Sequence, residues 1–232
     1  MNTYIVVGGT SGIGLETTKI LSKENRVIVL SRTNRNLDGI INVEFHSADV
    51  TKSADELPLI NDPIDGIVYC PGTINLKPLK SLKLEDFQND LEINLLGVVK
   101  VINKYFSNLK SAEKASIVLF STVAVQTGMP YHASVASSKG AVEGLTRSLA
   151  AEFSPSIRVN CIAPSITNTP LADKLLNNES KLKASEDRHP LKRIGSAEEI
   201  AHTVEFLLSD KSGFITGQII KIDGGISSVK IL

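Results

Sequence analysis

A glycine-rich segment near the start of the chain has the spacing of a phosphate-binding loop. It reads Gly8-Gly9-Thr10-Ser11-Gly12-Ile13-Gly14 and separates a short apolar run, Tyr4–Val7, from a segment with helical spacing. Glycines leave room for the backbone to approach a pyrophosphate, and the next helix offers free N–H groups and the positive end of its dipole. A tight turn alone would explain an isolated glycine pattern, but not one in this context. The residues predicted to contact a dinucleotide here are Gly8, Thr10, Ser11, Gly12, Ile13 and Gly14.

Short β-branched runs alternate with helical segments along the whole chain. The runs are Tyr4–Val7, Arg26–Leu30, Val43–His46, Gly66–Cys70, Ser116–Phe120, Ile157–Ile162 and Gln218–Ile222. Most are apolar at nearly every position, which is typical of strands covered on both faces. Helices are expected over 12–23, 83–108, 134–153 and 196–208. The pattern predicts an α/β fold in a single domain, 1–232: a Rossmann-type doubly wound parallel sheet of about seven strands with helices on both faces.

Two further segments have a predicted role beyond the core. Residues 170–195 are the most polar long stretch, so we expect a flexible substrate flap near 165–195. The helix over 83–108 carries more apolar surface than one sheet face needs, and Gly140 and Gly144 share a face of the helix over 134–153. Subunit contacts or ordinary packing within the chain would each explain these two helix faces.

Composition excludes several classes of protein. Lys plus Arg total 25 and Asp plus Glu total 25, so no excess basic charge favours nucleic acid. No apolar stretch approaches the length of a transmembrane helix, and the first residues do not have the pattern of a signal peptide. Cys70 and Cys161 lie in apolar strands as packing residues, and the histidines lack paired metal-ligand spacing. We expect a cytoplasmic protein without a metal, a nucleic-acid partner or a membrane partner.

The motifs as a set resemble the short-chain dehydrogenase/reductase family over essentially the whole chain, most closely its oxoacyl-reductase-like branch. The matching segments are Asp49-Val50, Tyr69-Cys70-Pro71-Gly72, Asn94, Val159–Pro164, Thr169, Pro190–Gly195, Glu198–Ala201, Ile215–Gln218 and Asp223–Gly225. Two departures are visible: only Gly72 remains of the family's turn after the fourth strand, and Ser165 replaces a glycine. The resemblance implies a nicotinamide cofactor bound by Asp49, Val50, Gly72, Lys139, Pro164 and Thr169, a small-molecule substrate, and a homotetramer or homodimer. It also implies that Asp65 steadies the sheet near the adenine pocket.

The turn after the second strand indicates which cofactor is used. An acid there would hold a free ribose 2′-hydroxyl, whereas an arginine would pair with a 2′-phosphate. The sequence is Leu30-Ser31-Arg32-Thr33, with Arg35 close by and no acid. Ser11 argues the other way, because many NADP-preferring members carry a basic residue at that position. We therefore predict that NADP(H) is favoured over NAD(H), and that Arg32 binds the ribose 2′-phosphate.

The catalytic set implied by the resemblance is incomplete. In the family a tyrosine passes the proton, a lysine four positions later lowers its pKa and holds the ribose, a serine binds the substrate oxygen and an asparagine supports a water relay. Ser138-Lys139-Gly140-Ala141 identifies Lys139 as that lysine, and Asn94 matches the asparagine. The tyrosine position is then Val135 and the serine position Thr122. Their spacing is intact, so the tyrosine is substituted and not shifted.

Three hypotheses follow from Val135. The first is an oxidoreductase with another proton donor; Tyr131, four positions earlier, is the main candidate, and His132 and Ser134 are also close. A conjugated alkene substrate would relax the need for the tyrosine. The second is a degenerate member that binds the dinucleotide but acts as a sensor, scaffold or partner in a hetero-oligomer. The third is a non-redox enzyme on the same scaffold. Losing a general acid costs about 10²–10⁴-fold and not all activity, so Val135 alone does not decide between them.

Overall fold

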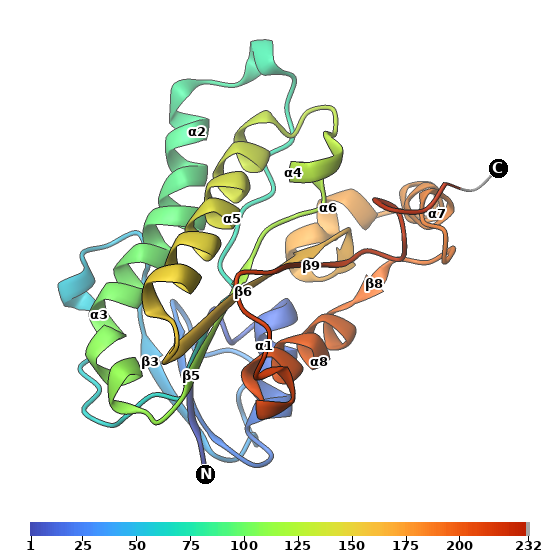
Figure 1. Cartoon of the computed structure of the whole chain (residues 1–232). Coiled ribbons are helices and arrows are strands. Elements are labelled where there is room, and N and C mark those ends of the chain that lie inside the picture. Colours follow the sequence, from blue (N-terminus) through green and yellow to red (C-terminus); the bar gives the residue numbers. More distant parts are fainter. Residues whose placement is uncertain (231–232) are drawn as a thin grey trace.

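The apolar runs pair into one parallel sheet of seven strands (Figure 1). The computed structural model describes residues 1–230. The strand order is β3 (Val43–Ser47), β2 (Arg26–Ser31), β1 (Thr3–Val7), β4 (Gly66–Tyr69), β5 (Ala115–Phe120), β6 (Ile157–Pro164) and β9 (Ile219–Ile222). The order reverses between β1 and β4, and open α/β sheets bind ligands at the carboxyl ends of the strands beside such a point. The predicted Rossmann-type fold is confirmed.

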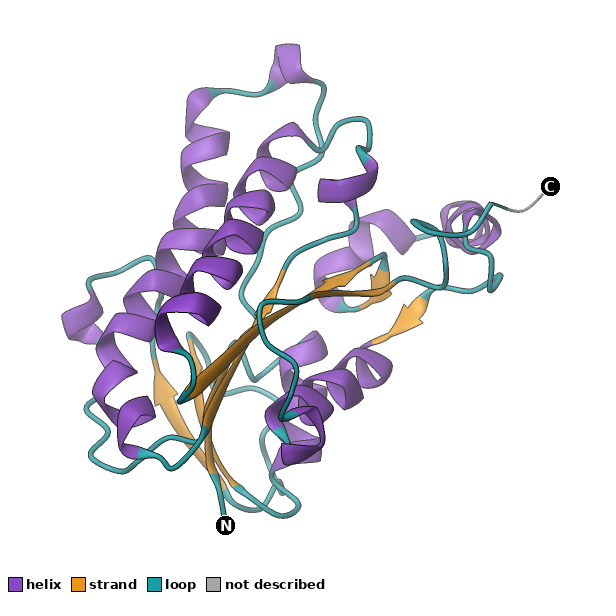
Figure 2. Cartoon of the chain, in the orientation of Figure 1, coloured by secondary structure: helices purple, strands orange, loops and turns teal. Residues whose placement is uncertain are grey.

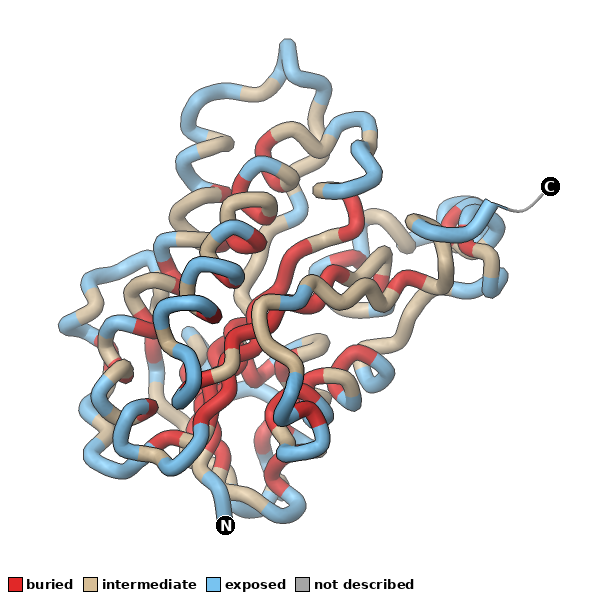
Figure 3. Tube along the Cα trace, in the orientation of Figure 1, coloured by how far each residue is buried: buried red, intermediate tan, exposed pale blue. Residues whose placement is uncertain are grey.

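Helices cover both faces of this sheet (Figure 2). The helices on one face are α2 (Leu84–Leu91), α3 (Gly97–Ser111) and α5 (Ala133–Phe153), and those on the other are α1 (Gly12–Leu21) and α8 (Ala197–Leu208). Alternate residues of each strand serve the two layers: Ile5 and Val7 pack towards α3 and α5, whereas Tyr4 and Val6 pack towards α1 and α8. This explains why the strand sequences are continuously apolar, and Figure 3 shows them as the buried centre.

The helix expected over 83–108 is interrupted. A π-helical turn, Glu92–Leu96, separates α2 from α3 and contains the fully buried Asn94. No proline or glycine marks the start of this turn, so the periodicity of the sequence does not reveal it. Single π turns within helices frequently occur at functional sites.

The segment expected as a flap is largely helical. It holds a two-residue strand β7 (Thr167–Asn168), a 3₁₀ turn (Pro170–Ala172), α6 (Asp173–Leu176), α7 (Glu179–Arg188) and strand β8 (Gly195–Ser196), which pairs with β7. The remaining elements are α4 (Ala124–Thr127) and 3₁₀ turns over Ala54–Glu56, Leu79–Ser81 and Asp210–Ser212. The flexibility of this segment stays a prediction.

Asp65 has a different position from the one expected. Its Oδ2 atom accepts a hydrogen bond from the Thr3 backbone N–H at 2.7 Å, and its own N–H donates to the Thr3 carbonyl at 2.8 Å. These bonds join the beginnings of β1 and β4, whereas the glycine loop follows the opposite end of β1. The expectation that Asp65 supports the adenine pocket is therefore wrong. Within residues 1–230, no helix is both long and apolar enough to cross a membrane.

Candidate active site

The glycine loop leads from β1 into α1 with a backbone that larger residues could not follow. Gly8 (φ +76°) and Gly12 (φ +52°) adopt left-handed conformations, and the Gly8 N–H donates to the Leu30 carbonyl at 2.8 Å. A Cβ atom on Gly14 would lie 2.3 Å from the Gly8 carbonyl oxygen, so only glycine fits there. The first turn of α1 carries no acidic side chain, which leaves its dipole available to an anion.

Two hydrogen bonds join this loop to the turn after β2. The Thr10 and Ser31 hydroxyls lie 2.9 Å apart, and Asn36 donates to the Thr10 carbonyl at 3.1 Å. Arg32 is exposed in this turn. Hydrogen bonds from the Thr51 N–H and hydroxyl hold the pKa of Asp49 below its ordinary value, with a smaller contribution from the charge of Arg32.

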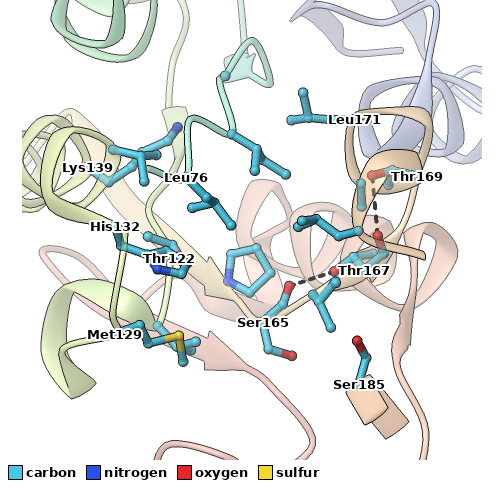
Figure 4. Close-up of a pocket in the computed structure, with 18 of the residues that line it drawn as sticks. Leu76, Thr122, Met129, His132, Lys139, Ser165, Thr167, Thr169, Leu171 and Ser185 are labelled. Atoms are coloured by element: carbon cyan, nitrogen blue, oxygen red, sulfur yellow. Dashed lines mark hydrogen bonds between the residues drawn. The ribbon is translucent and has the colours of Figure 1, made fainter. Parts of the chain in front are cut away.

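A cavity of about 720 Å³ opens at the carboxyl ends of the central strands (Figure 4). Its lining comes from the glycine loop, the ends of β4, β5 and β6, the start of α5, and α6 with α7. The predicted site residues in this lining are Ile13, Gly72, Thr122, Lys139, Pro164 and Thr169. In Figure 4, Lys139, Thr122 and His132 lie on one side, and Thr169 and Leu171 lie opposite. Residues distant in the sequence therefore share one space.

Lys139 lies at the inner wall of the cavity, with only 7% of its surface exposed. Its Nζ atom donates to the Phe120 carbonyl at 3.0 Å and forms no ion pair with any carboxylate in residues 1–230. Burial lowers the pKa of Lys139 to about 8, and the opposing influences of Cys161, Cys70 and Asp90 are smaller. Lys139 can therefore gain or lose a proton near neutral pH.

The side-chain amide of Asn94 is only partly hydrogen-bonded. Its Nδ2 atom donates to the Thr73 and Ser138 hydroxyls, at 2.9 Å each, while the buried Oδ1 atom has no hydrogen-bond partner among residues 1–230. A Cβ atom on Gly72 would lie 3.4 Å from both this Oδ1 atom and the Nζ atom of Lys139. Because position 72 is glycine, the two polar atoms face one another across an open space.

The catalytic candidates are not all brought together. Thr122 is half-buried and lines the cavity, as does Val135, which lies one helical turn before Lys139 and is 6% exposed. Tyr131 is 60% exposed and lies outside the cavity lining. Its backbone has φ +68°, and its carbonyl accepts a hydrogen bond from the Lys77 N–H. The structure therefore unites Asn94, Thr122 and Lys139, but not Tyr131.

The structure also brings a serine and a histidine together that the sequence analysis did not pair. His189 is 2% exposed, its Nδ1 atom lies 2.7 Å from the Ser185 carbonyl, and its Nε2 atom lies 2.9 Å from the Ser165 hydroxyl. A carbonyl accepts only, so Nδ1 donates to Ser185, while Nε2 and the Ser165 hydroxyl share the second hydrogen bond. Both side chains line the cavity. The sequence feature that could have pointed to this pair is Ser165, which stands where the family has a glycine.

The residues present fit a bound nicotinamide dinucleotide. Small residues leave the space it needs: a Cβ atom on Gly12 would lie 3.3 Å from Thr169, and one on Gly72 would fill the space beside Lys139. The buried Oδ1 atom of Asn94, which has no partner among residues 1–230, can accept a hydrogen bond from a bound ligand or water. Cys70 also lines the cavity, and burial raises the pKa of its thiol to about 12, which leaves the thiol protonated and unreactive.

The chain is similar to known proteins over almost its whole length. The family profile described as enoyl-(acyl carrier protein) reductase matches residues 7–227. L-xylulose reductase of Bos taurus is 32% identical over 230 residues, which cover 95% of this chain and 94% of the relative. The 3-oxoacyl-[acyl-carrier-protein] reductase FabG of Thermotoga maritima is 31% identical over 239 residues, which cover 96% of each chain.

Solved structures share the whole architecture. A short chain dehydrogenase family protein from Francisella tularensis is 32% identical with a TM-score of 0.89, over 99% of this chain and 100% of the other. A 4-hydroxyisoleucine dehydrogenase complexed with NADH is 26% identical with a TM-score of 0.88, over 99% of this chain and 100% of that one. The chain belongs to the short-chain dehydrogenase/reductase family, whose homologues here are oxidoreductases that use nicotinamide cofactors.

Proposed function

We propose that this protein is an NADP(H)-dependent oxidoreductase that transfers a hydride between nicotinamide and a small carbonyl, alcohol or activated alkene. The observation that carries the proposal is the single cavity shared by Ile13 of the glycine loop, Thr122 and Lys139. A dinucleotide on the loop would extend into the space where these polar side chains lie. Asp49 and Val50 would border its adenine, and Pro164 and Thr169 its nicotinamide.

Each polar residue has a distinct task in this proposal. When bound, the nicotinamide supplies or accepts the hydride. The backbone N–H groups at the start of α1 hold the pyrophosphate, and Lys139 holds the adjoining ribose. The Thr122 hydroxyl donates a hydrogen bond to the substrate oxygen. The free Oδ1 atom of Asn94 accepts from a water that returns protons to Lys139.

Val135 occupies the family's tyrosine position in this proposal, so another group must hold the proton. Lys139 is suited to the task, because its ammonium lies one helical turn from Val135, lines the cavity and has a pKa of about 8. As the carbonyl carbon gains a hydride, its oxygen becomes negative and takes a proton from the Nζ atom. Lys139 is left as a neutral amine and regains its proton through the Asn94 water.

Titration with NADPH and NADH, followed by nicotinamide fluorescence or heat, tests the cofactor assignment. We expect micromolar binding with NADPH favoured. Arg32→Ala should weaken NADPH binding about tenfold and leave NADH unchanged, since a charge-assisted pair with the 2′-phosphate is worth about that much. NADH is the internal control. An unchanged preference in Arg32→Ala would refute the role of Arg32.

Tyr131→Phe tests whether the exposed tyrosine takes part. Because its side chain lies outside the cavity lining, we expect turnover within about twofold of the unaltered protein, the range of a surface change. His132→Gln is the comparison variant, because His132 is the next residue in the chain and does line the cavity. A loss of tenfold or more in Tyr131→Phe would restore Tyr131 as the proton donor and require the loop to rearrange.

The degenerate-member hypothesis is the second candidate, and Val135 is the observation that favours it. In that case the protein would serve as a sensor, scaffold or partner through the outer faces of α3 and α5. A Cβ atom on Gly144 of α5 would meet nothing within 4 Å, so this face has room for a neighbouring helix. The same helices would form the homodimer or homotetramer of the first candidate. Failure to bind either dinucleotide would favour the second candidate.

A further inference from the structure

The wall of the cavity is cationic although the chain as a whole is neutral. Lys174, Lys181 and Arg188 line it in addition to Lys139, and no aspartate or glutamate within residues 1–230 lines it. The complete chain has 25 Lys plus Arg and 25 Asp plus Glu, so this is a local concentration and not a general excess. A cavity lined by one sign of charge raises the local concentration of ligands of the opposite sign.

Two of these cations, Lys181 and Arg188, come from one face of α7, and Lys174 comes from α6. Lys181, Ser185 and Arg188 recur at helical spacing and all face the cavity. Charged groups elsewhere on the helix do not line it: Lys183 pairs with Asp187 at 3.3 Å. The same is true of Glu179 and Glu186 of α7 and of Asp173 on α6. The acids of α7 and Lys183 therefore lie away from the face that carries Lys181 and Arg188.

Within residues 1–230, the two α7 cations that line the cavity, Lys181 and Arg188, contact only neutral acceptors. The Nζ atom of Lys181 donates to the Lys174 carbonyl at 3.2 Å and to Asn177 Oδ1 at 2.9 Å. Arg188 donates to the Ser185 hydroxyl and to the Ala184 carbonyl, each at 3.1 Å. No ion pair in the described chain involves either side chain. Their charges are available to a ligand, and Arg188 retains donors for a bidentate contact.

The helix is tied firmly to the cavity. At its N-terminus the Asn178 side chain caps the Lys181 N–H at 2.9 Å. At its C-terminus the buried His189 joins the Ser185 carbonyl to the Ser165 hydroxyl at the end of β6. Figure 4 shows Ser165 and Ser185 on the same side of the cavity. This anchoring holds the α7 face that carries Lys181 and Arg188 beside the cavity, where both side chains are also exposed to solvent.

We propose that the substrate is an anionic carbonyl compound, whose carboxylate or phosphate binds Lys181 and Arg188 while its carbonyl lies at Thr122 and Lys139. The inference rests on the proposed function and names the substrate class of the same site. The rest of the cavity lining is mainly apolar, with Leu76, Met129, Leu171 and Leu175 among its residues. They suit an unbranched carbon chain. A carboxylate or a phosphate has the required chemistry.

Matched pairs of substrates test this inference in the NADPH-loaded protein. One pair is levulinate and methyl levulinate, and the other is dihydroxyacetone phosphate and dihydroxyacetone. In the unaltered protein we expect kcat/KM at least tenfold higher for the charged member of one pair, with the difference mainly in KM. The substrate pair that shows this difference in kcat/KM tells whether the site prefers a carboxylate or a phosphate. Equal or better use of both neutral members would overturn the inference.

The double variant Lys181→Gln, Arg188→Gln should reduce that preference at least tenfold and leave the neutral substrate unchanged. Lys183→Gln is the matched control, because Lys183 is on the same helix but outside the lining. Equal effects of the control and the double variant would refute a specific site. High salt should also reduce the preference, since the exposed charges are screened.

Calorimetry separates a failure of this inference from a failure of the proposed function. If NADPH binds and only neutral substrates are reduced, the function stands and the inference fails. If neither member of a pair is reduced, binding of levulinate or dihydroxyacetone phosphate is measured directly. Binding of the anion that is lost in the double variant supports an anion site without redox chemistry. Binding that persists in the double variant, or no binding, refutes it.

Discussion

Val135→Tyr is expected to raise carbonyl reduction about 10²–10⁴-fold, the range that a positioned general acid contributes. Position 135 lies one turn before Lys139 on the same face of α5, and it opens into the cavity. A phenol there would be next to an ammonium, which favours the phenolate and so lowers the pKa of the tyrosine. The cavity of about 720 Å³ has room for the ring. The measurement is kcat/KM for NADPH-dependent reduction of a ketone panel.

Val135→Phe is the matched control, because it introduces the same ring without the hydroxyl. We expect it to reduce or preserve turnover, so that any gain in Val135→Tyr belongs to the proton and not to packing. If both variants remain at the starting rate while NADPH binding is intact, the absence of the tyrosine is not what limits the reaction. The degenerate-member hypothesis would then gain support.

Lys139→Met is expected to lower turnover by at least about 10²-fold, through loss of the proposed proton donor and the ribose contact. The pH dependence of the unaltered protein provides the distinguishing readout. Its reduction rate should fall as pH rises through about 8, because the ammonium of Lys139 loses its proton there. A tyrosine at position 135 should change the position of this fall. A rate independent of pH between about 7 and 9 would exclude Lys139 as the donor.

The same variant is expected to stabilise the protein without cofactor. Burial lowers the pKa of Lys139 from 10.5 to about 8 in the folded state. Between these values the unfolded chain binds more protons, so the free energy of unfolding rises with pH; below about 8 the full penalty remains. Lys139→Met removes this penalty and the bond to Phe120, for a net gain of roughly 2 kcal/mol at neutral pH.

Chemical denaturation of the unaltered protein and the variant at pH 7 and 10 measures this difference. The gain should be large at pH 7 and smaller at pH 10. Lys183→Met serves as a control, because Lys183 is exposed and its charge costs little in the folded state. Equal stability of Lys139→Met and the unaltered protein at both pH values would show that Lys139 is not held against a desolvation penalty. The buried lysine would then be hydrated.

Local chemistry explains what the sequence predicted correctly. The strands follow from apolar runs, since a strand covered on both faces needs apolar side chains at consecutive positions. The glycine loop is recognisable because Gly14 leaves no space for a Cβ atom and Gly12 adopts a positive φ, and both are requirements of the chain itself. Lys139, Thr122 and Asn94 were selected by resemblance to the family's motifs, and the structure places them beside one cavity or its inner wall, while their roles stay predictions.

Features that depend on direction or on distant partners needed the tertiary structure. Sequence distance placed Tyr131 near position 135, yet the backbone turns before α5, and the side chain lies outside the cavity. A π turn that buries Asn94 leaves no mark in hydrophobic periodicity. The pairing of Ser165 with His189 joins residues 24 positions apart. The inward face of α7 depends on that anchor. The sequence by itself determined the fold and the glycine loop, because backbone sterics and burial follow from residue type. The tertiary structure decided which side chains meet, because that depends on where distant elements pack.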